Sequence, residues 1–248
     1  MNKALAHIST DGTRTQTVYE HLSGTAHLAG AFAAAFGAQQ EAEYAAWLHD
    51  IGKYSAAFQQ RLAGGCATDH STAGAQEAMR CCPPHIQAAF AIAGHHTGLP
   101  DGGNRRTAAE GTLFGRLKKP VEPYTGWQEV TLPQSAPPDW ANRDPLDFAF
   151  FTRMLYSCLV DADFIDTETF MNGQAAPRSS GAEIGPLLEK VRAKARQYLA
   201  AQSISPVSTQ RNAVLHACMD KGAQGTPGLY TLTVPTGGGK TFASLAFA

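Results

Sequence analysis

The chain has 248 residues, which is enough for one large domain, or for one domain and part of another. Hydrophobic residues make up 44% and charged residues 17%, and no apolar run approaches the roughly 20 residues that span a bilayer. A formal net charge of −1 excludes nucleic-acid binding by overall charge, so a polyanionic partner must be held by a local patch or by metal ions. Five cysteines without a C-x-x-C pair and an N-terminus without a secretory signal favour the reducing cytoplasm, with no membrane partner.

Apolar residues at spacings of three and four predict that the first part of the chain is helical. The predicted helices cover residues 15–37, 40–51, 55–62, 71–80 and 84–94. The first part of the chain therefore reads as one helix after another.

The periodicity lapses over 99–144, where Gly, Pro and Trp are frequent and only a short helix is predicted at 107–118. Long connections of this kind are usually functional or mobile. Helical spacing returns over 145–165 and over 186–202, and the intervening residues, 166–185, are predicted to form a loop.

A second domain is predicted near the C-terminus. A helix is expected over 207–221, the alternation of Leu229–Val234 predicts a buried strand, and Pro235–Thr241 is a glycine-rich loop before a helix. The predicted fold class is therefore mainly α over 1–203, followed over 204–248 by the first strand and phosphate loop of an α/β domain.

Several of the nine histidines stand in pairs or beside carboxylates. His49 and Asp50 end an apolar helix, where both side chains can reach one metal ion and the second carboxylate oxygen can bridge to another. The other candidate ligands are His21, within the first predicted helix, His70, just before a helix, His95 and His96, at the end of one, and Asp161 or Asp163, late in a long apolar helix. A single His-Asp pair occurs by chance, so the ordered set carries the prediction.

The alternative is that these histidines are structural, as we expect for the isolated His7, His27, His85 and His216. For the clustered set, that interpretation would have to hold five times. It would also leave aspartates among apolar neighbours, where an unpaired charge is costly. Metal coordination explains both features.

The ligand types indicate two divalent transition-metal ions. Imidazole favours Fe, Ni, Zn, Co or Cu, and the carboxylates keep Mn and Mg open. Two ions about 3.5–4 Å apart polarise a phosphoryl oxygen and activate the nucleophile, which is the chemistry of phosphoester hydrolysis. Lys53, one turn beyond His49, is a candidate for neutralising the scissile phosphate, or else a solvated lysine at a helix end.

The glycine-rich loop has the pattern of a phosphate-binding loop. Successive glycines let backbone N–H groups surround phosphates, a lysine reaches the β/γ-phosphates, and a threonine holds Mg²⁺. Val234 replaces the first glycine of G-x-x-x-x-G-K-T, as in the helicase variant. The predicted nucleotide-binding residues are Thr236, Gly237, Gly238, Gly239, Lys240 and Thr241.

The ordered histidine–aspartate set followed by this loop resembles the HD nuclease domain of the CRISPR-associated helicase-nuclease of type I systems, cut off just inside its helicase. The matching strings span nearly the whole chain: 21–24 (HLSG), 48–53 (LHDIGK), 58–62 (FQQRL), 69–75 (DHSTAGA), 94–96 (GHH), 159–163 (LVDAD) and 205–248.

The resemblance implies an HD-domain helical bundle that cleaves single-stranded DNA, as an endo- or exonuclease, in antiviral defence. It implies an ATP-dependent helicase that feeds the nuclease, with ATP and Mg²⁺ bound only by the intact helicase. The implied partners are single-stranded DNA, an RNA-guided CRISPR surveillance complex, and phage inhibitor proteins. No ATPase activity is expected from a chain that stops at Ala248.

The resemblance also assigns ligands. The first ion would take His21, His49, Asp50 and Asp163, and the second would take Asp50, His70, His95 and His96, with Asp50 bridging. Because the family's last aspartate follows an alanine, Asp163 is preferred and Asp161 is the alternative. His49, Asp50 and Lys53 are the implied catalytic residues.

Two other functions stay open: an HD-type nucleotide phosphohydrolase, and a non-catalytic module that docks a partner while its metals only stabilise the fold. The cluster of Arg105, Arg106, Arg116, Lys118 and Lys119 either tracks a DNA backbone or is a solvated loop face.

Overall fold

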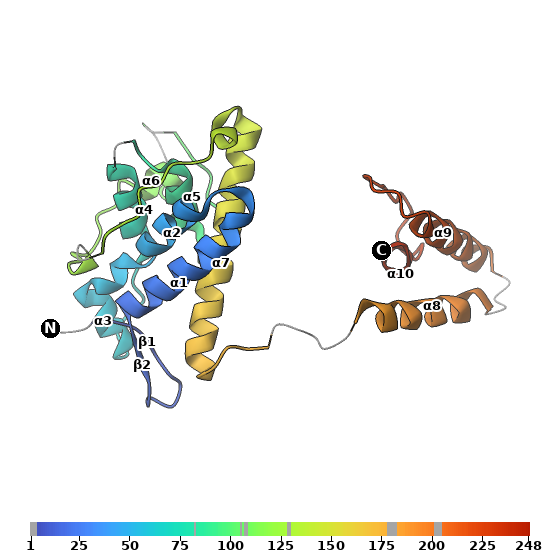
Figure 1. The fold of residues 1–248 in the computed structure, drawn as a ribbon, viewed down its shortest axis with the longest axis horizontal. Helices are drawn as coiled ribbons and strands as arrows, with labels where there is room; N and C mark the ends of the chain where they lie inside the picture. The colour runs from blue at the N-terminus through green and yellow to red at the C-terminus, as the bar shows by residue number, and fades with distance from the viewer. Residues whose placement is uncertain are drawn as a thin grey trace. The chain divides into compact units, whose positions relative to one another are not determined.

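The computed structural model describes residues 4–81, 83–104, 106, 109–127, 130–177, 183–200 and 205–248. The chain is mainly helical, as predicted (Figure 1). It divides into two compact units, Met1–Ala176 and Pro177–Ala248.

The first unit begins with a hairpin that the sequence pattern did not predict. Strands β1 (Leu5–Ile8) and β2 (Thr15–Thr17) pair antiparallel, and helix α1 (Val18–Ala33) follows directly. The predicted helix over 15–37 therefore starts too early. Thr17 has extended backbone and caps α1, because its side chain accepts from the backbone N–H of Glu20 while the Glu20 carboxylate accepts from that of Thr17.

The helices that follow confirm the periodicity. They are η1 (Ala34–Phe36), α2 (Gln39–Leu48), η2 (Ile51–Tyr54), α3 (Ala56–Leu62), α4 (Ser71–Arg80), α5 (Ile86–Gly94), α6 (Leu113–Arg116), η4 (Asp139–Asn142) and α7 (Pro145–Asn172). Helix α6 is shorter than predicted, and part of the predicted 107–118 lies outside the described residues.

Helix α7 corrects the sequence prediction most strongly. It continues seven residues past the predicted end at 165 and stops where Gly173 adopts a left-handed φ of 74°. The loop predicted over 166–185 is thus wrong for 166–172. Polar residues such as Thr167 and Glu168 hid the helix there, because apolar periodicity fades where one face is solvated.

The packing of the core fixes the positions of the predicted ligands. Helix α1 packs on α2 and α7, and α5 packs on α4 and α7 (Figure 1). Leu22, Leu48, Ile51 and Ala162 are fully buried, and each adjoins a predicted ligand in the sequence. Burying each leucine or isoleucine stabilises the fold by roughly 1.5–3 kcal/mol, so the same contacts that form the core fix the backbone beside the ligands.

The second unit contains α8 (Ile184–Ala200), α9 (Pro206–Ala223) and α10 (Lys240–Phe247), with α9 packed on both of the others. Helix α8, which we assigned to the first domain, therefore packs in the second unit. The functional division into 1–203 and 204–248 stays a prediction.

The strand predicted over Leu229–Val234 is wrong for this structure. The segment has no strand pairing, and the Leu229 side chain is 96% exposed. A strand requires a hydrogen-bonded neighbour, and the described residues of this unit supply none. No helix in the described ranges is long and apolar enough to cross a membrane.

Candidate metal centre

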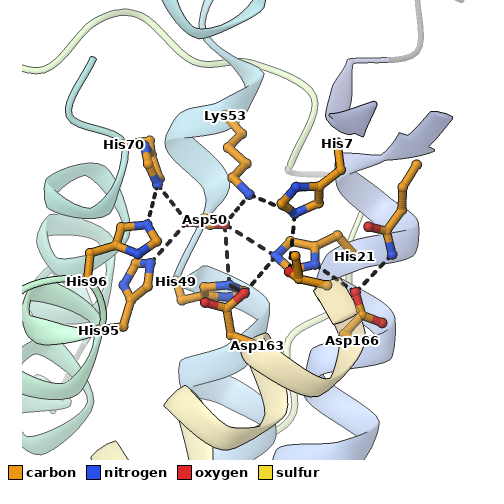
Figure 2. Close-up of polar contacts among 12 residues, drawn as sticks. His7, His21, His49, Asp50, Lys53, His70, His95, His96, Asp163 and Asp166 are labelled. Atoms are coloured by element: carbon orange, nitrogen blue, oxygen red, sulfur yellow. Dashed lines mark hydrogen bonds and ion pairs between the residues drawn. The ribbon is translucent and has the colours of Figure 1, made fainter. Parts of the chain in front are cut away.

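Asp50 lies at the centre of the predicted ligands (Figure 2). It follows the end of α2 and precedes η2, and its side chain is fully buried. Its Oδ2 lies 3.3 Å from Nε2 of His21 and 3.4 Å from Nε2 of His49. Its Oδ1 lies 3.3 Å from Nε2 of both His70 and His95. The two oxygens of one carboxylate thus face two different sets of imidazoles.

The structure brings together both predicted ligand sets. In each set, the donor atoms lie within 4.8 Å of one another: His21, His49, Asp50 and Asp163 form the first, and Asp50, His70, His95 and His96 form the second. In the second set, the Nε2 atoms of His70 and His96 are 2.7 Å apart.

The geometry favours Asp163 over Asp161. Asp163 Oδ1 lies 3.3 Å from Nε2 of His21 and 3.7 Å from Nε2 of His49, whereas Asp161 is exposed and belongs to neither ligand set. Asp163 follows the buried Leu159 by four residues, so the two share the inward face of α7.

The imidazoles of His49 and His95 are each oriented by a hydrogen bond at the other ring nitrogen. Nδ1 of His49 donates to the carbonyl of Ala46, and Nδ1 of His95 donates to that of Ile92, both at 2.7 Å. These carbonyls lie in the last turns of α2 and α5, so the helix ends themselves orient the rings. Fixing Nδ1–H leaves the Nε2 lone pair directed inward, as metal-ligating histidines require.

His21 is aimed by a carboxylate that the sequence analysis missed. Its Nδ1 donates to Asp166 Oδ2 at 2.7 Å, and the Gln16 side chain donates to the same oxygen at 2.8 Å. Asp166 lies three residues after Asp163 on α7, a spacing that places both on one face. The predicted end of the helix at 165 concealed this signal.

The residues present fit metal ions. The Nε2 atoms of His21, His49 and His95 and Oδ1 of Asp50 are buried and lack a hydrogen-bond partner among the described residues. Leaving such atoms without a partner costs about 1–3 kcal/mol each. Converging imidazoles and carboxylates suit divalent transition metals, which satisfy all four atoms at once.

The charged side chains of the cluster shift one another's pKa values. Burial lowers the pKa of His21, but the carboxylates of Asp163, Asp166 and Asp50 outweigh it and raise that pKa to about 10. Burial raises the pKa of Asp50, but Lys53 and the neighbouring histidines hold it well below the usual range. Burial also raises the pKa of Asp163, but the adjacent imidazoles of His21 and His49 outweigh it and hold that pKa far below normal, so both aspartates of the first set stay ionised.

Lys53 is not the solvated residue that one interpretation allowed. Its side chain is only 5% exposed, and Nζ lies 2.7 Å from Asp50 Oδ2 and 3.2 Å from Nε2 of His7. His7, which we expected to be structural or exposed, thus contacts the centre. His85 fits that expectation, since it is buried against the Glu41 carboxylate, away from the cluster.

The chain was compared with models of known protein families. The family model described as HD domain matches residues 18–125. Residues 18–125 are an HD domain. HD domains are typically hydrolytic, metal-dependent phosphodiesterases, and the His/Asp cluster fits that activity. The HD domain includes six of the seven ligands and ends before Asp163, which α7 supplies. A search of curated proteins finds no match.

The predicted phosphate loop lies in the second unit. Thr236 to Gly239 form a turn in which Gly237 and Gly239 have φ of 83° and 84°, and α10 begins at Lys240. Lys240 donates to the carbonyl of Val234 at 2.8 Å. A cavity of about 840 Å³ is lined by the loop, by Thr241 and by residues of α8 and α9.

The basic cluster is only partly a free surface. Arg116 donates to the carbonyl of Ala93, two residues before His95, and Lys119 pairs with Glu110. Arg105 lies outside the described residues.

Proposed function

We propose that this chain is a metal-dependent nuclease that cleaves single-stranded DNA at a two-ion centre bridged by Asp50. The observation that carries the proposal is the sharing of Asp50 between two complete ligand sets. A single structural ion needs only one such set, whereas two adjacent ions are typical of phosphodiester cleavage.

The chain's own residues have distinct tasks in this proposal. When bound, two ions polarise the phosphoryl oxygen and activate water for in-line attack. His21, His49, Asp50 and His95 are buried and exclude solvent from one side of the centre. His96 is exposed and Asp163 is 18% exposed, so a phosphodiester approaches from their side. Lys53 stabilises the ionised form of Asp50.

DNA as the substrate, and recruitment by an RNA-guided surveillance complex, are supported by the ordered motifs and the glycine-rich loop. A hydrolase of free nucleotides has no use for a motor that delivers a strand. Phage inhibitor proteins are proposed partners on the same grounds. The supporting feature in the structure is the loop's placement before α10, the arrangement that a phosphate loop requires.

The test uses circular single-stranded DNA and, separately, dNTPs, each with Mn²⁺ or with EDTA. We expect metal-dependent linearisation of the circles by the wild-type chain and its loss in Asp50→Ala. Asp161→Asn is the matched control, because it removes a carboxylate from α7 outside the cluster and should keep full cleavage. Turnover of dNTPs with intact circles would overturn the DNA assignment. Full cleavage by Asp50→Ala would show that cleavage does not depend on this centre, and a wild-type chain that binds metal without cleaving either substrate would favour the docking module.

The resemblance implies that ATP binds only to the intact helicase, but we infer that the loop of the second unit binds the phosphates of a nucleoside triphosphate by itself. The supporting observation is the loop's turn into α10, with Lys240 at the helix start beside a cavity. Titration with a fluorescent ATP analogue and Mg²⁺ should show binding that Lys240→Ala weakens by at least about tenfold, since charge-assisted phosphate contacts contribute roughly 1.5–3 kcal/mol. Lys190→Ala, which removes an exposed lysine of α8, should bind normally; equal binding by both variants would refute the inference.

A further inference from the structure

The N-terminal hairpin, Leu5–Thr17, precedes the HD domain and carries none of the predicted metal ligands. Its side chains nevertheless reach the metal centre. Register pairs His7 of β1 with Gln16 of β2. Because residues directly opposite each other in an antiparallel pair present their side chains on the same face, these two project together. Figure 2 shows His7 beside Lys53 and His21.

The first contact runs through His7. Its Nε2 accepts a hydrogen bond from the Lys53 ammonium at 3.2 Å, while the same ammonium lies 2.7 Å from Asp50 Oδ2. The His7 ring also meets the His21 ring edge to face, with centroids 4.7 Å apart. His7 thereby fixes the direction of the ammonium relative to the bridging carboxylate.

The second contact runs through Gln16, which is 8% exposed. Its amide N–H donates to Asp166 Oδ2, the oxygen that also receives the Nδ1–H of His21. Gln16 therefore restrains Asp166, and Asp166 restrains a ligand of the first ion.

The hairpin is anchored on both sides of the centre, so these contacts are held firmly. The Gln59 side chain bonds the backbone N–H and C=O of Leu5, at 3.0 Å each, and also the carbonyl of Lys53. Arg14 donates to the carbonyls of Phe170 and Met171, near the end of α7, at 2.8 and 2.9 Å. The hairpin thus links η2 to the C-terminal part of α7.

We propose that the N-terminal hairpin is a working part of the metal centre, in which His7 positions Lys53 on Asp50 and Gln16 positions Asp166 behind His21. Both act through other side chains and are positioning residues. Gln16 acts on the first ligand set alone, because it is joined through Asp166 to His21, whereas His7 acts through Lys53 on Asp50, which both sets share. The inference rests on the proposed function for the identity of the site. Its own consequence is that loss of Gln16 should change the affinities of the two ions unequally.

The test measures stepwise Mn²⁺ or Co²⁺ binding by calorimetry in two backgrounds. Asp163→Ala removes a ligand of the first ion, and His96→Ala removes a ligand of the second. Adding Gln16→Leu to His96→Ala should weaken binding of the remaining ion about tenfold, because Asp166, the hydrogen-bond partner of the ligating His21, loses the donor that restrains it. Adding it to Asp163→Ala should leave the remaining ion's affinity unchanged, since the hydrogen bonds of Gln16 lead through Asp166 to His21, which is not a ligand of that ion.

His7 is tested by conservative rescue. His7→Leu should slow cleavage about tenfold, whereas His7→Gln, whose amide oxygen can accept from Lys53, should restore most of the rate. Asp11→Ala is the matched control, because it alters the exposed turn of the same hairpin and should change neither affinity nor rate. The melting temperature of the metal-free Asp11→Ala variant measures how far a general destabilisation of the hairpin contributes.

Two results would overturn the inference. Equal weakening of both ions by Gln16→Leu, or unchanged affinities with only a lower melting temperature, would reduce the hairpin to a structural cover. Equal cleavage by His7→Leu and His7→Gln would remove the role of His7. The wild-type titration separates this failure from that of the proposed function. If the wild-type chain binds two ions but the variants give either result above, only the role of the hairpin is refuted. A wild-type chain that binds no ion would refute both.

Discussion

At the scale of single residues, the sequence predicts donors better than the groups that orient them. The seven ligands could be found because imidazoles and carboxylates within and beside apolar helices are chemically conspicuous. Asp166 and Gln16 could not, since an aspartate on a helix face and a glutamine in a short strand look like ordinary surface residues. Only the packing of α1 on α7 brings Asp166 to the ring of His21.

Asp166→Asn should lower metal affinity by roughly 10–100-fold, because an amide is a weaker and differently directed partner for His21 Nδ1–H than a carboxylate. Gly24→Ala should have a similar effect, since a Cβ at this position of α1 would collide with Asp166 Oδ1. Metal titration of the purified variants measures both changes. Wild-type affinity in both variants would show that Asp166 does not orient His21.

At the scale of elements, helical periodicity predicted α2 to α5 closely and failed at the borders of α1 and α7. Two strands of four and three residues are too short to leave an alternation signal, and the periodic pattern of α1 extended over β2. The start of α1 is set instead by a local device, the capping box of Thr17 and Glu20. This border matters because the hairpin must end where the helix bearing His21 begins.

Thr17→Ala should destabilise the first unit by about 1 kcal/mol, since it removes the acceptor for one unpaired N–H at the start of α1. Chemical denaturation of the metal-free chain measures this free energy of unfolding. Thr13→Ala, in the exposed turn of the hairpin, is the control and should stay within about 0.5 kcal/mol of wild type. Equal stabilities of the two variants would contradict the capping role.

At the scale of the whole molecule, the mainly helical class followed from composition and periodicity, but the packing units did not. Helix α8 was assigned to the first domain because the linker pattern comes only after it, at 205–208, yet it packs with α9 and α10. The strand predicted at 229–234 failed for the complementary reason. An alternating pattern indicates that a segment can enter a sheet, whereas the neighbouring strands decide whether it does.

The central claim is that Asp50 joins two metal sites, and the metal content of the purified chain tests it most directly. We predict two divalent transition-metal ions per wild-type chain and per Asp161→Asn chain after loading and desalting, and fewer than one in Asp50→Ala, because that variant removes a donor from both sets at once. Two ions retained by Asp50→Ala, or one or none bound by the wild-type chain, would contradict the account.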